Sequence, residues 1–252
     1  MGMLTPEIRI SFRDLLREAR AQAIKDAEAF EELLFVFEKL GSFLKGEIGA
    51  LGHYKEKIID LAKESPLANE IPTHHREFHS SAAILFNLVR DARNDALHQG
   101  AFARHLTSHA IELSIILEDA LMSQALNVSD FMVRNPVCAE MWQPLSFIRQ
   151  QLLANSFSYL PVKNKNGTWE LVSDAAIACF LRDKTSDRKK RLAQTLEEAC
   201  TEDPTISSSA EMVLANEGIE KVLGKLNERP LLVHRQNDQS ELVGIITAFD
   251  LL

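Results

Sequence analysis

Leu242-Val243-Gly244-Ile245-Ile246-Thr247-Ala248-Phe249-Asp250 begins as an apolar run of strand length and ends in a hydroxyl residue followed three positions later by an acid. A short apolar run bounded by turn residues is typical of a buried β-strand. The residues before it predict a helix over 218–227, a strand over 231–234 and a polar turn over 236–240. This segment therefore predicts the order helix, strand, turn and strand.

The same order occurs earlier in the chain. The predicted elements are a helix over 144–154, a strand over 157–162, a hairpin-type turn over 164–167, a strand over 169–172, a helix over 174–181 and a polar connector over 183–191. A repeated order of elements indicates a duplicated structural unit. The sequence pattern changes near Asn127, so we place a first repeat at 126–183 and a second at 192–252.

Short stretches of both repeats carry a family resemblance. They are Phe131–Pro136, Tyr159–Val162, Arg229–Val233 and Gly244–Asp250. Together they resemble a tandem pair of CBS domains covering residues 126–252. The resemblance implies an α/β pair whose two repeats pack into one disc. It also implies a cleft that binds an adenine nucleotide (AMP, ADP or ATP) as a regulatory ligand.

The pattern Ser/Thr-x-x-Asp holds the nucleotide in that family. A hydroxyl at the end of a strand, where a helix opens, offers donors to a phosphate, and an Asp can accept hydrogen bonds from ribose hydroxyls. The resemblance assigns these roles to Thr247 and Asp250. In the first repeat Ser173 matches the hydroxyl, but Ala176 replaces the acid. We therefore expect one nucleotide site, and a second repeat truncated at its C-terminal helix or completed by another segment. The alternative for this half is a packing and dimerisation module.

The first half of the chain has helical patterning throughout. Apolar residues recur at spacings of three and four over 6–46, 48–64, 75–97 and 102–121, without strand signals. This predicts an antiparallel bundle of four or five helices over 1–125. The expected fold class is therefore a two-domain α+β protein, with an all-α bundle followed by the α/β pair.

Arg93-Asn94-Asp95-Ala96-Leu97-His98 is the chemically richest stretch of that bundle. Arginine binds phosphate through paired charged hydrogen bonds, and histidine transfers protons near neutral pH. In a helical domain, this spacing resembles the HEPN superfamily. The resemblance implies a metal-independent endoribonuclease that acts as a dimer, with Arg93 and His98 catalytic and Asn94 orienting. RNA is the implied substrate because its 2′-hydroxyl is the nucleophile.

The spacing of this motif limits what one subunit can do. Positions five apart on a straight helix diverge by about 140°, so Arg93 and His98 do not share a face. We expect a break in the helix, closure by the reach of the arginine, or a site completed by a second subunit across a two-fold axis. The alternative is a solvated helix end, with Arg93 paired to an acid.

Composition restricts the other possibilities. Formal net charge is −8 for 252 residues, with a net of −5 over 1–125 and −3 over 126–252. Neither half is therefore a broad basic surface for DNA or RNA. No apolar run reaches a membrane span, no signal peptide is evident, and three scattered cysteines suit free thiols in the cytoplasm. We expect no metal cofactor, although His105, His109 and Glu112 share one helical face with spacing that suits a metal.

These patterns lead to two hypotheses. The first is a nucleotide-regulated, metal-independent endoribonuclease whose CBS-like pair senses an adenine nucleotide. The second is a non-catalytic, adenine-nucleotide-binding regulatory protein. Both expect a homodimer, formed through the helical domain, the C-terminal pair, or both.

Overall fold

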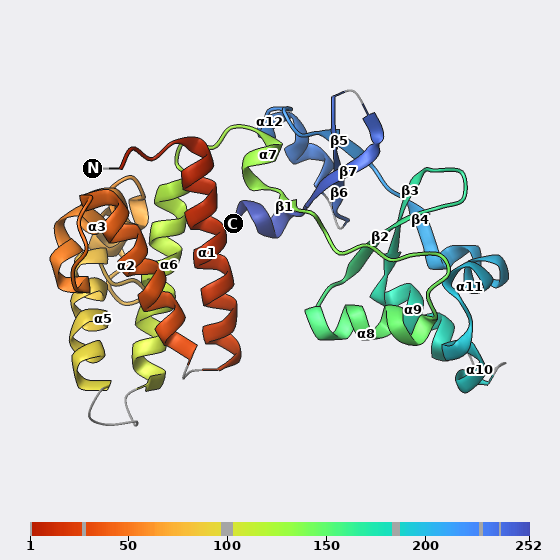
Figure 1. Cartoon of the computed structure of the whole chain (residues 1–252), viewed down its shortest axis with the longest axis horizontal. Coiled ribbons are helices and arrows are strands. Elements are labelled where there is room, and N and C mark those ends of the chain that lie inside the picture. Colours follow the sequence, from red (N-terminus) through yellow and green to blue (C-terminus); the bar gives the residue numbers. More distant parts are fainter. Residues whose placement is uncertain (1, 27–28, 97–102, 183–186, 227–228, 237) are drawn as a thin grey trace. The chain divides into compact units, whose positions relative to one another are not determined.

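The computed structural model describes residues 2–26, 29–96, 103–182, 187–226, 229–236 and 238–252 (Figure 1). For 94–96, 103–105 and 238–239 it describes the backbone alone. The chain forms two compact units, Met1–Ala125 and Leu126–Leu252.

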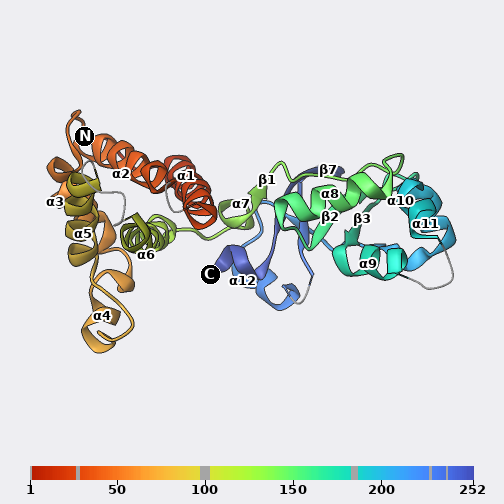
Figure 2. The ribbon, with the colours of Figure 1, turned by 90° about the horizontal axis from the view of Figure 1, so that it is seen from below.

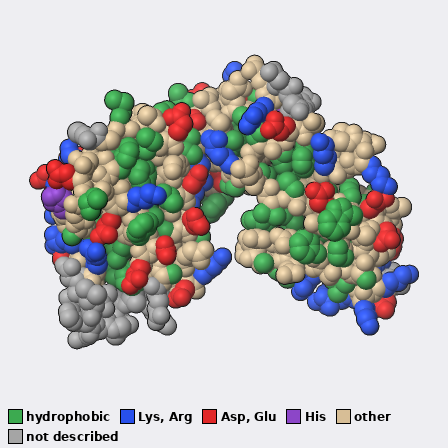
Figure 3. All heavy atoms as spheres, in the orientation of Figure 1, with side chains coloured by type: hydrophobic (Ala, Val, Ile, Leu, Met, Phe, Trp, Pro, Cys, Tyr) green, Lys and Arg blue, Asp and Glu red, His purple; other side chains and the backbone are tan. Residues whose placement is uncertain are grey.

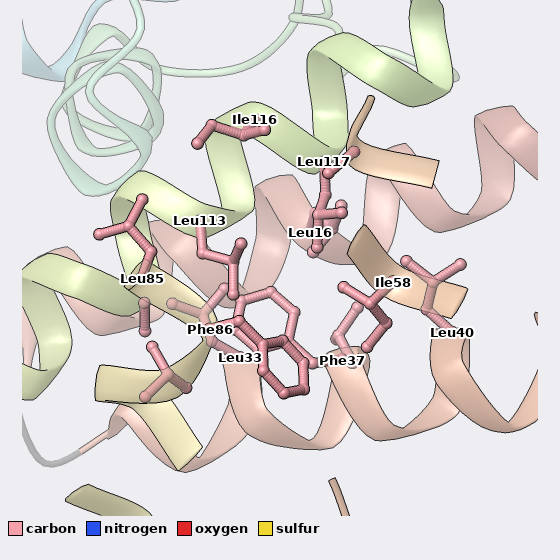
Figure 4. Packing of buried hydrophobic residues seen from close by; sticks show 14 of the residues in the cluster. Leu16, Leu33, Phe37, Leu40, Ile58, Leu85, Phe86, Leu113, Ile116 and Leu117 are labelled. Carbon is pink, nitrogen blue, oxygen red and sulfur yellow. The ribbon is translucent and has the colours of Figure 1, made fainter. Parts of the chain in front are cut away.

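The N-terminal unit is a helical bundle, as its spacing predicts. Its helices are α1 (Pro6–Lys25), α2 (Phe30–Lys45), α3 (Lys55–Ala62), α4 (Glu70–His74), α5 (Ala82–Ala96) and α6 (Ala103–Met122), with 3₁₀ turns η2 (Leu51–Tyr54) and η3 (Pro66–Ala68). Helices α1, α2 and α6 contact one another, α5 packs on α6, and α4 lies at one edge (Figures 1 and 2). Leu16, Phe37, Phe86 and Leu113 are fully buried at the centre, where the side chains of Phe37 and Phe86 point toward each other (Figure 4).

The prediction of a helix from residue 75 is wrong at its start. Helix α5 begins at Ala82, and its first turn closes when the Leu85 amide donates to the Ser81 carbonyl at 3.0 Å. Phe78 fits the helical spacing, yet its side chain is 77% exposed and lies outside any helix. Ser80 and Ser81 interrupt the pattern because serine favours helix starts over helix interiors.

Arginines on α1 hold the bundle together by charge as well as packing. Arg9 Nη1 donates to the Ala120 and Leu121 carbonyls at 3.1 and 3.4 Å, at the C-terminal end of α6. The same guanidinium binds Glu64 through both terminal nitrogens, at 2.9 and 3.1 Å. A cation at a helix C-terminus is stabilising because the carbonyls there lack helical partners. Glu118 of α6 forms ion pairs with both Arg17 and Arg20 of α1.

The C-terminal unit contains two sheets. Its strands are β1 (Val133–Arg134), β2 (Tyr159–Lys163), β3 (Trp169–Ser173), β4 (Ser207–Ser209), β5 (Met212–Leu214), β6 (Leu231–Arg235) and β7 (Asp238–Ile246). One sheet has the order β1-β7-β6-β5 and the other β2-β3-β4. The helices are α7 (Val128–Phe131), α8 (Leu145–Asn155), α9 (Asp174–Arg182), α10 (Arg188–Ala193), α11 (Leu196–Glu202) and α12 (Ile219–Val222), with 3₁₀ turns η4 (Pro204–Ile206), η5 (Leu223–Lys225) and η6 (Ala248–Leu251).

The two repeats exchange their leading strands. Strand β1 of the first repeat pairs with β7 of the second, with Val133 opposite Ile245. Strand β4 of the second repeat pairs with β3 of the first, with Val172 opposite Ser207. Each sheet therefore contains strands from both repeats, and backbone hydrogen bonds tie the repeats into one unit.

The segment predicted as a polar connector, 183–191, contains the start of a helix. Arg191 of α10 is buried, lies 4.3 Å from the centre of the Phe180 ring and pairs with Glu202 at 3.3 Å. Its neighbours Arg188, Lys189 and Lys190 are exposed, and basic side chains gather in this part of the unit (Figure 3). The helix predicted over 218–227 is also shorter, because it ends with α12 and η5 at Lys225.

All three cysteines are free. Burial raises the pKa of the Cys138 and Cys200 thiols, whereas the Cys179 side chain is exposed. Within the described ranges, no helix combines the length and apolarity that crossing a membrane requires.

Candidate nucleotide site

A pocket of about 630 Å³ lies where the two sheets of the C-terminal unit meet. Its lining residues are Leu171, Ser209, Glu211, Lys225, Arg229, Pro230 and Leu231. Leu171 and Ser209 belong to the three-stranded sheet, and Leu231 begins β6 of the other. The volume is within the range of small-molecule sites, roughly 300–1,000 Å³.

The pocket has an apolar floor and a charged rim. Leu171 and Leu231 are each 2% exposed, and Pro230 is buried beside them. At the rim, Lys225 Nζ lies 3.3 Å from Glu211 Oε1, and both side chains are about half exposed. An apolar floor suits a planar ring, and the rim cations suit an anion.

Arg229 brings a second cation to this rim. It lies directly before the buried Pro230, and its Nη1 donates to Ser208 Oγ of β4 at 3.2 Å. Both residues belong to the second repeat, and the bond links the segment before β6 to the sheet that contains β2, β3 and β4. The hydrogen bond from Nη1 holds the guanidinium group at the rim, and Arg229 remains exposed to solvent.

Thr247 and Asp250 lie at the same end of the sheet as the pocket. Leu231 pairs with Ile246, so Pro230 and Thr247 lie at the same end of neighbouring strands. Asp250 Oδ2 accepts hydrogen bonds from the Thr247 amide at 2.7 Å and from Thr247 Oγ1 at 2.8 Å. Asp250 is 7% exposed. The two residues thus hold each other in a capping box, and neither is among the residues that line the pocket.

Ser173 has a capping role in the first repeat. Its Oγ accepts a hydrogen bond from the Ala176 amide at 3.0 Å, in the first turn of α9. This matches the use of serine at helix starts. The structure therefore places Ser173 at a strand-to-helix junction, as the sequence predicts, with its hydroxyl engaged by the backbone.

Of the predicted Arg93, Asn94 and His98 motif, the structure describes the side chain of Arg93 alone. Arg93 is in the last turn of α5, and its Nη2 lies 2.9 Å from Glu38 Oε1 of α2. That oxygen is buried and has no hydrogen-bond partner, so the contact is an ion pair without hydrogen-bond geometry. Only the backbone of Asn94 is described, and His98 lies outside the described residues.

The sequence reasoning missed Glu211 and Lys225. Neither belongs to a motif, and the structure brings them together because the end of η5 lies against the residue that precedes β5. Arg229 and Pro230 lay within a stretch singled out for its resemblance, but nothing in the sequence distinguished Arg229 as a rim cation. In the part of the chain that the structure describes, no group of three His, Cys, Asp or Glu residues could hold a metal ion.

Comparison with known proteins finds similarity only at the level of solved structures. No protein-family model matches the sequence, and no curated protein matches it. The similar solved structures are CBS-domain proteins, and they match the C-terminal half of the chain.

Three of these structures illustrate the extent of the likeness. A CBS domain-containing protein of unknown function from Bacillus anthracis is 16% identical, with a TM-score of 0.42, over 51% of this chain and 91% of that chain. CbpB in complex with c-di-AMP is 16% identical, with a TM-score of 0.40, over 50% of this chain and 81% of its own. CBSX2 in complex with AMP is 19% identical, with a TM-score of 0.38, over 50% of this chain and 92% of its own.

Proposed function

We propose that the C-terminal unit is a regulatory module that binds one adenine nucleotide in the pocket between its two sheets. The observation that carries this proposal is the pocket itself, with its apolar floor and the rim cations Lys225 and Arg229. The turn from Thr247 to Asp250, at the same end of the sheet, adds a hydroxyl and a carboxylate.

Each part of the site has a role in this proposal. The base lies on the apolar floor, and the phosphate accepts hydrogen bonds from Lys225 and Arg229. Ribose hydroxyls donate to Asp250, which exchanges part of its capping interaction with Thr247 for the ligand. Ser173 sits in a turn without the acid, because Ala176 occupies that position. The proposal is therefore one nucleotide per chain.

Calorimetric titration with AMP, ADP and ATP tests this function. We expect the variant Arg229→Ala to bind at least about tenfold more weakly than the wild type, because a charged hydrogen bond to phosphate is lost. Asp250→Asn keeps the side-chain volume while weakening ribose binding. Arg235→Ala is the matched control, since Arg235 is exposed on β6 and does not line the pocket. Wild-type protein that binds none of the three nucleotides contradicts the proposal.

We also propose a second function, RNA cleavage by a dimer of the helical unit. The observation in its favour is the position of Arg93 in the last described turn of α5, with its side chain 38% exposed. Arginine carries five donors, and the pair with Glu38 involves Nη2. Arg93 can therefore contact a phosphate while Glu38 holds it in place, with His98 as the proton-transfer group.

Cleavage of a test RNA in buffer containing EDTA measures this activity. We expect Arg93→Ala and His98→Ala each to abolish cleavage, because one removes the phosphate contact and the other the acid or base. Arg90→Ala is the control, since Arg90 lies on the same helix and is paired with Asp91. Equal cleavage by all variants, or none by the wild type, contradicts the proposal.

A further inference from the structure

We propose that Glu211 makes the pocket selective for nucleotides with few phosphates, so that AMP binds more tightly than ATP. This inference rests on the proposed nucleotide-binding function. It assigns to Glu211 a role in specificity that no sequence motif indicates.

The position of Glu211 is fixed by its backbone. The Leu232 amide donates to the Glu211 carbonyl at 3.0 Å, immediately before β5 pairs with β6. Its side chain consequently stands at the rim, where its carboxylate contacts Lys225. A phosphate that binds Lys225 must therefore compete with Glu211 or lie beside it.

The charges at the rim favour a small anion. Among the described lining residues there are two cations, Lys225 and Arg229, and one anion, Glu211. One terminal phosphate group, with a charge of about −1.5 to −2 near neutral pH, can contact both cations, although Glu211 leaves the rim with a net charge of only +1. Each further phosphate adds negative charge near Glu211 without another described cation in the lining.

The expected difference between the AMP and ATP affinities depends on how exposed the rim charges are. The side chains of Lys225 and Glu211 are 42% and 54% exposed, so solvent and salt screen their fields. We expect AMP to bind about tenfold more tightly than ATP at low salt, and the ratio to shrink as salt is added. Because half-exposed ion pairs contribute little to stability, removing the Glu211 charge leaves the protein folded.

The test is the variant Glu211→Gln, which removes the charge and keeps the shape. Titration with AMP and ATP, in EDTA and low salt, is expected to show ATP binding strengthened about five- to tenfold and AMP binding changed by less than about threefold. Glu241→Gln is the matched control. Glu241 is a half-exposed acid of β7, 3.8 Å from Arg235, and does not line the pocket. This control is expected to leave the ratio unchanged.

The outcomes separate this inference from the function on which it rests. Wild-type protein that binds ATP as tightly as AMP overturns the selectivity alone. An unchanged ratio of AMP to ATP affinity in the Glu211→Gln variant overturns the selectivity as well. Wild-type protein that binds no adenine nucleotide overturns both the selectivity and the proposed function. A thermal unfolding curve of Glu211→Gln that matches the wild type confirms that the variant is folded.

Discussion

Arg9 and Glu64 show how single side chains determine the acid response of the helical unit. Arg9 is only 8% exposed, but both of its terminal nitrogens are bound by Glu64 or by the end of α6. Burial alone raises the pKa of Glu64. Hydrogen bonds from Arg9 and Ser123, together with the charge of Arg9, outweigh it and leave the pKa of Glu64 below its ordinary value. The carboxylate is therefore stabilised in its charged form.

The lowered pKa of Glu64 predicts how stability depends on pH. A carboxyl group whose pKa is lower in the folded state stabilises the fold above its unfolded pKa, about 4.5, and loses that contribution as pH falls through the folded pKa. We expect Glu64→Gln to cost about 1 kcal/mol at pH 7 after solvent screening. The cost shrinks as pH falls from about 5 to 3. Urea unfolding at several pH values measures it.

A nearby acid provides the control for this pH dependence. Glu56 is exposed on α3, so Glu56→Gln should follow the wild-type pH curve. If the curves of Glu64→Gln and the wild type run parallel between about pH 5 and 3, the lowered pKa does not contribute to stability.

At the same scale, sequence patterns could predict some side-chain contacts and not others, while the nucleotide-binding role of Thr247 and Asp250 stays a prediction. Thr247 and Asp250 could be predicted because a hydroxyl and an acid three positions apart form a local unit, and the structure shows them as a capping box. The contact between Glu211 and Lys225 could not be predicted. Glu211 precedes β5 and Lys225 ends η5, and only the folded structure brings their side chains to one rim. Local spacing carries no information on such contacts.

The secondary-structure elements also differ in whether local sequence patterns predict them. Strands β2, β3 and β6 were predictable because each has a run of apolar residues beside a turn, and their side chains fill the core. Strands β1 and β4 were not, because they have two and three residues and are defined by their partners in the other repeat. Pairing across repeats has no signature in either strand alone.

Gly41 governs the contact between α2 and η2. It is buried, and a Cβ atom there would overlap the Tyr54 side chain. We expect Gly41→Ala to destabilise the helical unit by about 1–3 kcal/mol, because overpacking exceeds alanine's advantage in helix propensity, about 1 kcal/mol. Urea unfolding followed by circular dichroism measures this change.

Gly218 offers the matched control for this substitution. A Cβ atom at Gly218 meets nothing within 4 Å, and its φ of −64° is open to any residue. Gly218→Ala should therefore leave stability within about 0.5 kcal/mol of the wild type. Equal stability of the two variants would show that Tyr54 moves aside at no cost.

At the scale of the whole molecule, each unit has buried clusters of its own. Among the residues that the structure describes, the buried cluster of the N-terminal unit runs from Phe12 to Leu121 and includes Leu16 and Phe86. The C-terminal unit has two clusters of its own, around Val172 and Val233. Helical spacing and the repeat predicted this division of secondary structure, because both are local patterns. The HEPN resemblance of residues 1–125 stays a prediction, because its key histidine, His98, lies outside the described residues.

A nucleotide that binds only the C-terminal unit should raise the unfolding temperature of that unit and leave the other unchanged. Both tryptophans of the chain, Trp142 and Trp169, belong to the C-terminal unit. Trp169 Nε1 donates to the Ser240 carbonyl, so its fluorescence follows the association of the two repeats. Fluorescence thus reports the C-terminal unit, whereas circular dichroism at 222 nm is weighted toward the helical bundle.

With AMP at one hundred times its dissociation constant, the stabilisation is about 2.7 kcal/mol. We expect the fluorescence transition to rise by roughly 8 °C. The circular dichroism transition of the bundle should stay in place, and Arg229→Ala should remove the shift. If both transitions move together, AMP binding stabilises the helical unit as well. The candidate ribonuclease would then be thermodynamically coupled to the nucleotide, because any ligand that stabilises one state of a protein shifts its population toward that state.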